Sequence, residues 1–385
     1  SVTMVSVKVD IVTMVINDEA ELNRFLDVAE ENKIGNSRMG VFKLGNDIVC
    51  TGTYASHYVD GDTRGTIGVA AGFNGTFDGQ GYTIYNLHTV GDRGGFVGPL
   101  GEHGVVKNVS FVNASNTGNG AFIASNGCGT VENVYIQIDI TPNSLSWNNA
   151  SSVIVSDPFG AFRINNVIIE YINELPSGAS SGYPVWNVHF GYGINNGVYA
   201  VGVDKYYGNK GEGDPANPAD EYATYADWSA FEAGGKSFED WEGDFWTVED
   251  GIPVPKKLVE KGSSVSIGNT ELSVPVNSTV EIDTMGIYQK ISLDAAAVEA
   301  GFTVKGNTVT VPETAAGKSF TVTVTSLIDG KTAEKTFKVV ETENITVSET
   351  TEIDMTETGE LTFDLTGYDI EGSVVSAKID KTEFA

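Results

Sequence analysis

Residues 106–138 read VKNVSFVNASNTGNGAFIASNGCGTVENVYIQI, and one short pattern occurs near each end of this stretch. The pattern is an apolar residue, any residue, Asn, an apolar residue and any residue, and five strings that carry it define the repeat. The central residues are 22, 25, 33 and 21 positions apart, and they are Asn86, Asn108, Asn133, Asn166 and Asn187. A unit that recurs at such a period predicts a solenoid, in which each unit completes its core by stacking on the next.

The repeated strings are too short and too rich in β-branched residues for helices, so we expect a bent strand in each. One coil of a parallel β-helix uses slightly more than about 20 residues and rises by about 4.8 Å, the distance between neighbouring strands. Asn suits the bend because it tolerates left-handed backbone angles and because its amide can bond to the backbone or to the next Asn. A second register accompanies the Asn strings, with GGFVG at Gly94, GAFIA at Gly120, SVIVS at Ser152 and GVYAV at Gly197.

The composition restricts the classes of partner. The chain has 385 residues, which favours two or three domains, and a net charge of −29. This charge argues against nucleic acid, whose phosphates require Lys and Arg, and against an anionic membrane surface. No apolar run approaches the roughly 18 residues that span a bilayer, and no signal sequence or tail anchor is found. Because Ser1 is followed at once by strand-like sequence, we interpret the chain as processed or trimmed. Cys50 and Cys128 are interpreted as two buried small residues, with a bridge between coils as the alternative.

Residues 1–32 are expected to form N-terminal strands and a short capping helix. Asn17 or Asp18 is the expected N-cap, and acidic residues follow in the first turn. The expected apolar face of the helix consists of Leu22, Phe25, Leu26 and Ala29. Such a helix would cover the first coil, which otherwise exposes its core and its unpaired strand edge.

Three further segments follow the helix. Residues 33–257 are predicted to form the β-helix, and its aromatic-rich end, from Trp228 to Trp246, is expected to cap the C-terminal coil. Carbohydrate stacking is the alternative role for these Trp residues. Residues 258–342 contain short alternating strands typical of a small β-sandwich, and residues 343–385 look like the start of a further β domain that is cut short.

Several of these strings resemble a known family. The segment FNGTFDGQGYTIYNL from Phe73, followed by GGFVG and VKNVSF, resembles the GLUG-type repeat region of large bacterial cell-surface proteins. The stretch WEGDFWTVEDGIPVPKKL looks like the usual end of such a region, and residues 262–341 are similar to bacterial immunoglobulin-like (Ig-like) modules. The resemblance covers residues 17–341 and implies an all-β protein, with a right-handed parallel β-helix followed by an Ig-like β-sandwich. It brings no catalytic residues with it.

Polysaccharide lyases and hydrolases also use right-handed β-helices, with acids and bases that project from neighbouring coils. One expected outward stripe is Tyr85, Lys107, Glu132, Asn165 and Trp186. The other is His88, Ser110, Tyr135, Ile168 and His189. The stripes hold a single carboxylate and therefore no glycosidase pair, and their two His residues are about 19 Å apart at the strand spacing. We therefore predict no catalytic residue, and the candidate ligand contacts are Tyr85, Tyr135, Trp186 and His189.

Two loops are further candidates for binding. The interval of 33 residues between Asn133 and Asn166 implies an insertion at 142–152, and solenoids place binding surfaces on such loops. Four carboxylates of the polar loop at 203–222 could gather around Ca²⁺, with a solvated acidic loop as the alternative. These are Glu212, Asp214, Asp220 and Glu221. No other cofactor is predicted.

These features predict a non-enzymatic, extracellular, adhesin-like surface protein that displays a β-helix on Ig-like modules. Its expected partner is a glycan, a matrix component or a host or cell-surface protein, without nucleic acid and without membrane insertion. Two alternatives remain, a polysaccharide-active lyase or hydrolase with its site on inserted loops, and a phage virion appendage or decoration protein. The sequence predicts no particular oligomeric state.

Overall fold

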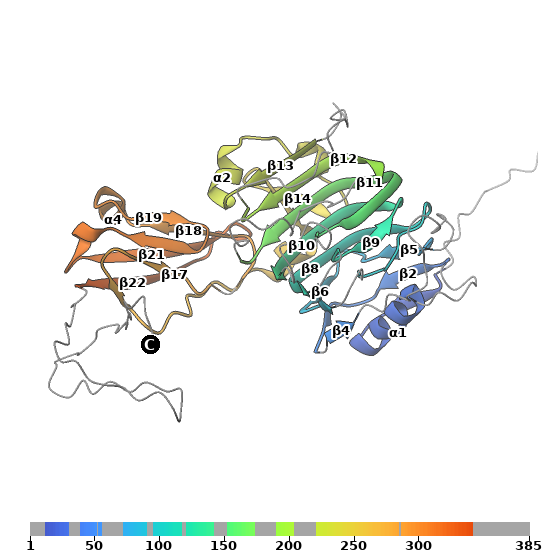
Figure 1. Ribbon diagram of the computed structural model, residues 1–385, viewed down its shortest axis with the longest axis horizontal. Coiled ribbons are helices and arrows are strands. Elements are labelled where there is room, and N and C mark those ends of the chain that lie inside the picture. The colour runs from blue at the N-terminus through green and yellow to red at the C-terminus, as the bar shows by residue number, and fades with distance from the viewer. Residues whose placement is uncertain are drawn as a thin grey trace, which may run out of the picture. The chain divides into compact units, whose positions relative to one another are not determined.

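The computed structural model describes residues 12–30, 39–51, 53–55, 72–90, 95–117, 121–141, 152–173, 190–203, 221–284 and 286–341. They divide into two compact units, with the boundary after Ser263 and with Leu327–Asp329 assigned to the first. We call these unit 1 and unit 2. Strands dominate both units, so the described part of the chain is mostly β (Figure 1). Residues 343–385, expected to begin a further domain, lie outside the described residues.

Unit 1 is built on a large parallel sheet to which the chain returns repeatedly, each time one strand further along. The strand order is β1-β2-β5-β8-β10-β11-β12-β13, and every neighbouring pair is parallel. Figure 1 shows these strands side by side in chain order, from blue to green. Their bounds are β1 Met14–Ile16, β2 Val41–Leu44, β5 Thr76–Asp78, β8 Val105–Thr117, β10 Thr130–Thr141, β11 Val155–Tyr171, β12 Phe190–Val201 and β13 Glu221–Tyr225. We call each return of the chain a layer.

The first two full layers are broken into three short strands, whereas later layers run on as one long strand. The layer of β2 continues in β3 (Ile48–Val49) and β4 (Thr53–Ala55), and that of β5 continues in β6 (Thr83–Tyr85) and β7 (His88–Val90). Strands β5, β6 and β7 all pair with the single strand β8. A layer is also longer than predicted, because hydrogen-bonded Asn side chains on successive layers are 25 and 33 residues apart.

Helix α1 (Glu19–Glu30) packs its apolar face against the first layers. The Phe25 ring lies 4.9–5.8 Å, between centroids, from the rings of Phe42, Phe73, Phe77 and Phe96. Asp18 is the N-cap of the helix, and its carboxylate accepts a hydrogen bond from the backbone N–H of Glu21 at 2.9 Å. Buried Leu22 and Leu26 complete the face, so the helix covers the core where the sheet begins.

The second register predicted from the sequence stacks as expected for three of its four strings. The N–H of Phe96 donates to the carbonyl of Phe122 at 2.8 Å, and the N–H of Phe122 donates to the carbonyl of Ser152 at 3.1 Å. Strand β9 (Ala124–Gly127) then continues this side of unit 1 beside the start of β11. The fourth string, at Gly197, belongs to the main sheet, where Val198 pairs with Val167, so its assignment to the second register is wrong.

Unit 2 consists of two sheets that share one hydrophobic core. The four-stranded sheet has the order β16-β22-β21-β18, and the three-stranded sheet has the order β17-β20-β19. Their bounds are β16 Ser273–Pro275, β17 Ser278–Glu281, β18 Gln289–Leu293, β19 Thr303–Lys305, β20 Thr308–Val311, β21 Ser319–Ser326 and β22 Thr332–Val340. Both sheets contribute to the core, and the rings of Phe302, Phe320 and Phe337 pack in sequence within it.

Asp294 links the short helix α4 (Ala295–Glu299) to β21, and this link makes unit 2 sensitive to acid. Its carboxylate accepts hydrogen bonds from the N–H groups of Thr321 at 2.6 Å and Ala297 at 2.9 Å. These bonds, that of Thr321 first, hold the pKa of Asp294 below its ordinary value of 3.8. We expect Asp294→Ala to lower the free energy of unfolding of unit 2 by about 1 kcal/mol, because a helix cap is lost.

A folded-state pKa below the unfolded value means that the charge of Asp294 stabilises above about pH 4 and ceases to do so as the pH falls through the folded pKa. The wild type should therefore lose stability on acidification relative to Asp294→Asn, which keeps an acceptor oxygen without the charge. Thermal unfolding of both proteins at pH 6 and at pH 3 measures this. A stability difference that is the same at both pH values would contradict the prediction.

Candidate ligand-binding face

A ladder of amide side chains follows one corner of unit 1. Asn133 Nδ2 donates to Asn108 Oδ1 at 3.3 Å, and Asn166 Nδ2 donates to Asn133 Oδ1 at 3.3 Å. Asn108 Nδ2 in turn donates to Asp78 Oδ1 at 3.1 Å. The three Asn residues have φ angles of 52–55°, in the left-handed region that Asn tolerates better than most residues. Each of these Asn residues therefore adopts the left-handed backbone that the corner requires and also forms a hydrogen bond with the side chain on the neighbouring layer.

The five predicted Asn residues do not form one ladder. Strand β6 pairs with the middle of β8, so Asn86 is opposite Asn113, whose Nδ2 donates to Asn86 Oδ1 at 2.7 Å. The position that follows Asn166 in the ladder is Gly197, because the residues on either side of the two positions pair with each other. Asn187 lies outside the described residues. The single ladder is thus corrected to two corners, one with Asn108, Asn133 and Asn166 and one with Asn86 and Asn113.

Three residues of one predicted outward stripe, Ser110, Tyr135 and Ile168, are buried, whereas His88 is partly exposed and His189 lies outside the described residues. The strand pairing places five side chains in one row across neighbouring strands, and none of these side chains belongs to the inner core. This row, which we call the covered row, is Thr83, Ser110, Tyr135, Ile168 and Tyr199, and each is at most 2% exposed. The hydroxyl of Tyr135 donates to Glu170. Tyr135 is therefore not accessible to a ligand, and its prediction as a ligand contact is wrong.

The covered row lies beneath the aromatic-rich segment 226–261, which we call the strap. The strap contains α2 (Trp228–Ala233), the 3₁₀ helix η3 (Glu239–Trp241), the hairpin of β14 (Trp246–Glu249) and β15 (Ile252–Pro255), and α3 (Lys256–Lys261). Trp228 Nε1 donates to Glu170 Oε1 at 2.8 Å. The Tyr199 ring lies 5.1 Å from the Phe238 ring and 5.7 Å from the Trp241 ring.

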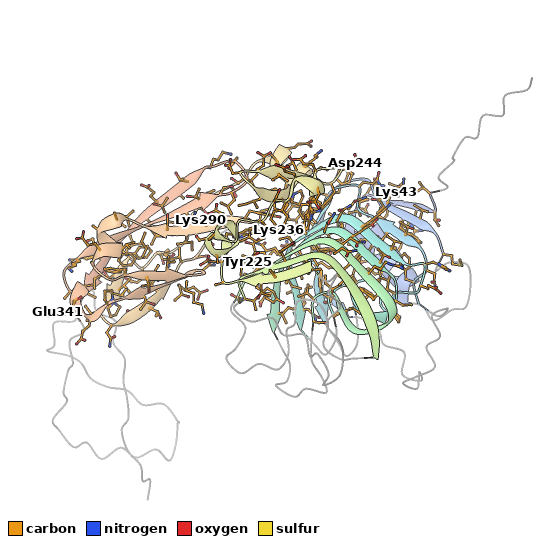
Figure 2. All side chains as sticks on the ribbon, turned by 90° about the horizontal axis from the view of Figure 1, so that it is seen from above. Lys43, Tyr225, Lys236, Asp244, Lys290 and Glu341 are labelled. Carbon is orange, nitrogen blue, oxygen red and sulfur yellow. The ribbon has the colours of Figure 1, made fainter. Side chains whose placement is uncertain are left out.

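The strap reaches the first layers at its other end. Lys257 Nζ lies 3.0 Å from the centroid of the Tyr82 ring, and Lys261 forms an ion pair with Asp47. Lys261 Nζ also donates to the hydroxyl of Tyr85 at 3.4 Å, so this predicted ligand contact lies beside the strap. The aromatic segment was expected to cap the last coil, but its contacts run from Glu170 and Tyr199 of the later layers to Tyr82 and Asp47 of the first layers. Figure 2 labels Lys236 and Asp244 of this segment, and Tyr225 of β13, which immediately precedes it.

The structure brings together a polar pair that the sequence stripes missed. His88 Nδ1 forms a hydrogen bond with Ser115 Oγ, and Asp139 is the residue paired with Ser115 on its other side. The prediction from the sequence placed His88 beside Ser110, because each follows an Asn of the repeated pattern, Asn86 or Asn108, by two positions. The likeness of IYNLH at 84–88 to FVNAS at 111–115 would have revealed the correct partner.

This arrangement does not reproduce the order of a nucleophile, a base and an acid. Asp139 on β10 is separated from His88 on β7 by strand β8, which carries Ser115. The carboxylate therefore has no imidazole to orient, which is its role in a catalytic triad. The pair reads as a polar contact between neighbouring layers.

The other predicted site residues are placed only in part. Trp186, His189, Glu212, Asp214 and Asp220 lie outside the described residues, and so does the side chain of Glu221 in β13. In the part of the chain that the structure describes, no three or more His, Cys, Asp or Glu residues gather closely enough to hold a metal ion. No described helix is both long and apolar enough to cross a membrane.

Cys50 and Cys128 are both buried thiols that do not form a disulfide, in agreement with their interpretation as core residues. Burial raises the pKa of the Cys128 thiol, and the nearby Glu102 carboxylate raises it further. A thiol with a raised pKa forms less thiolate and is a poor nucleophile at neutral pH.

The connections between layers begin side by side at one edge of unit 1. Ala55 pairs with Val90, Val90 with Thr117, and Thr117 with Thr141. Each of these residues is the last one described in its layer before the chain leaves for the next. The connections that follow are 56–71, 91–94, 118–120 and 142–151, and they lie outside the described residues. Their starting points form a single row across four layers.

Comparison with known proteins yields a partial similarity. Over 159 residues the chain is 29% identical to halomucin of Haloquadratum walsbyi. The aligned region covers 39% of this chain and 2% of halomucin. The chain thus spans a small part of the curated relative that it matches. No family model matches the sequence, and no solved structure matches it significantly.

Proposed function

We propose that this chain is a non-enzymatic extracellular surface protein that binds a glycan, or a protein of the matrix or of another cell surface, in the manner of an adhesin. In this proposal unit 1 is a right-handed parallel β-helix of GLUG-type coils and unit 2 is an Ig-like β-sandwich. The observation that carries the proposal is the row of connections that begin in register at one edge of unit 1, at Ala55, Val90, Thr117 and Thr141.

The scaffold suits display of these connections. Parallel pairing of successive layers and the ladder of Asn108, Asn133 and Asn166 hold the layers in one register. A scaffold of this kind leaves its connections free to vary in length and sequence without disturbing the core, and solenoids commonly bind through them. The strap covers the outward row on which a ligand was first expected, so the connections are the stronger candidates for binding.

Charge and similarity support the location. A net charge of −29 favours solubility and disfavours contact with nucleic acid or anionic lipid. The partial similarity to halomucin is compatible with a surface-associated protein. The two sheets of unit 2, which enclose one core, fit a module that separates a binding domain from its point of attachment.

Trp186 is the residue whose removal tests this proposal most sharply, because it belongs to the connection 174–189 that follows the layer of β11. Tyr171 pairs with Ile138, so this layer ends in register with the layer of β10 and its connection continues the row. We expect the full chain to bind one class of glycan or matrix protein on an array, and Trp186→Ala to weaken that binding about tenfold or more, as loss of an aromatic anchor does. Val298→Ala is the control, since it removes apolar atoms at an exposed position of unit 2 and should bind as the wild type does.

Thermal unfolding shows whether Trp186→Ala folds normally. The proposal fails if the folded wild type binds nothing on a broad array of glycans and matrix proteins, or if Trp186→Ala binds unchanged. Release of reducing ends or unsaturated sugars from a bound polysaccharide would instead make the protein an enzyme.

A further inference from the structure

We infer that the strap gives unit 1 a mechanical function. Under tension it transmits the pulling force to the first layers of unit 1, so that the later layers carry none of it. The inference extends the proposed surface role, because a surface protein held at one end and bound at the other is pulled along its chain. The strap is the segment that connects unit 1 to unit 2, so force from unit 2 reaches unit 1 through it.

The chain enters the parallel sheet at β1, beside the first full layer. Ile16 pairs with Leu44, and Met14 pairs with Phe42. Helix α1 then covers the core at the same end, with Phe25 packed among the phenyl rings of the first layers. A pull on the N-terminal side of unit 1 therefore acts first on β1 and β2.

The chain leaves unit 1 at the same end, although its last layer is β13. Helix α3 is attached to the first two layers by three contacts, which we call the latch. They are the ion pair of Lys261 with Asp47, the hydrogen bond of Lys261 to Tyr85, and the contact of Lys257 with the face of the Tyr82 ring. Asp47 also accepts a hydrogen bond from the N–H of Thr83 at 2.8 Å, so it joins the latch to both layers.

The other end of the strap is attached to the last layers. Trp228 bonds to Glu170 of β11, and Phe231 packs against the ring of Tyr225 in β13 at 4.9 Å between centroids. Trp241 packs so closely on β12 that a side chain at Gly197 would lie 2.6 Å from its indole. In Figure 2, Lys236 and Tyr225 lie toward the last layers, and Asp244 lies in the direction of Lys43 in β2.

These attachments decide which bonds carry the load. Without the strap the chain would leave unit 1 at β13, and a pull would separate β13 from β12 and then each following pair in turn. With the strap in place the pull acts on α3 and the latch, and the layers from β8 to β13 lie outside the path between the two points of attachment. The residues of the covered row stay buried for as long as the latch holds.

The latch contributes little to the free energy of unfolding, so it can be removed by mutation without unfolding the protein. Lys261 and Asp47 are partly exposed, at 37% and 28% of their side chains, and exposed ion pairs are weak. Lys257→Met and Lys261→Met together remove both charges and keep the aliphatic stems, so the double variant should fold normally. Lys318→Met with Lys338→Met, two exposed residues of unit 2, is the control with the same change of charge.

The experiment is single-molecule pulling of the full chain between handles at its two ends. In the wild type we expect release of the strap as one force peak that frees about 120 Å of chain, followed by the later layers. In the latch variant we expect this peak to be lost, with the peaks of unit 2 unchanged. The control variant should keep the peak. A latch variant that keeps the strap peak at the wild-type force would overturn the inference, and so would a wild type whose layers separate before the strap.

A second measurement changes the point of pulling and leaves the latch intact. A handle on the exposed Ser229 of α2 applies the pulling force directly to the last layers. We then expect the strands to separate in steps, beginning with β13, at a lower force than that of the strap peak. Equal forces from both attachment points would contradict load sparing. Neither measurement requires a ligand, so a failed binding array leaves this inference standing and a missing strap peak leaves the binding proposal standing.

Discussion

Phe25→Ala should destabilise unit 1 by about 3–5 kcal/mol, the range for removal of a buried phenyl ring from a tightly packed core. The ring is completely buried and touches four other phenyl rings from the first layers, with its closest centroid at 4.9 Å. Its loss leaves a cavity at the end of the sheet that α1 closes. Chemical denaturation should then show unit 1 unfolding at lower denaturant concentration, while the transition of unit 2 stays in place.

The matched control for Phe25→Ala is Met39→Ala, which removes a large apolar side chain that is 59% exposed. A surface change of this kind is expected to alter the free energy of unfolding by no more than about 0.5 kcal/mol. If Phe25→Ala and Met39→Ala shift the transition of unit 1 equally, α1 does not seal the core as described.

Asn133→Ala is the second large expected effect, about 3–4 kcal/mol, because it loses two hydrogen bonds and adds a backbone cost. The Asn133 amide bonds to the rungs on both sides, and each bond contributes about 1 kcal/mol. Ala at a φ of 53° adds a backbone cost of about 1–2 kcal/mol that Asn tolerates better. Denaturant unfolding of unit 1 measures the total.

Asn133→Gly separates the two contributions, since Gly adopts a positive φ freely but lacks the amide. It should therefore destabilise unit 1 less than Asn133→Ala does, by roughly the backbone cost. Asn173→Ala, at an exposed position after β11, is the control for loss of an amide outside the ladder and should have little effect. An equal loss for the Gly and Ala variants would show that backbone geometry does not explain the choice of Asn.

Local features of the fold were predictable from single strings. The cap at Asp18, the apolar face with Leu22 and Phe25, and the bends at Asn108 and Asn133 all follow from preferences of a few neighbouring residues. The stacking of GGFVG on GAFIA and SVIVS also follows, because similar strings recur at similar intervals.

The register beyond these strings was not predictable by counting from each Asn. The layer of β5 is broken into three strands, so Asn86 stands at the second corner of its layer and Asn108 at the first corner of the next. The interval of 22 residues between them is therefore not the length of a layer. The position that follows Asn166 in the ladder is occupied by Gly197, so a search for Asn does not find it.

The candidate site was predicted less well than the fold, and the reason is the strap. Alternation along β10 correctly places Tyr135 on the side away from the inner core, but it carries no information on what lies above that side. The strap that covers the row bonds to Glu170 from Trp228, 58 residues further along the chain. Burial of an outward position by so distant a segment leaves no trace in the local pattern.

The sequence by itself determined that this chain forms stacked, bent strands with Asn at the corners, because φ preference and side-chain alternation are properties of a few adjacent residues. Only the tertiary structure decided which corners stack on one another and which outward row is closed to solvent. Both depend on contacts between residues far apart in the chain, such as Lys261 and Asp47, which are 214 positions apart. Such contacts form because the covered row and the strap each bury apolar surface that neither can bury alone.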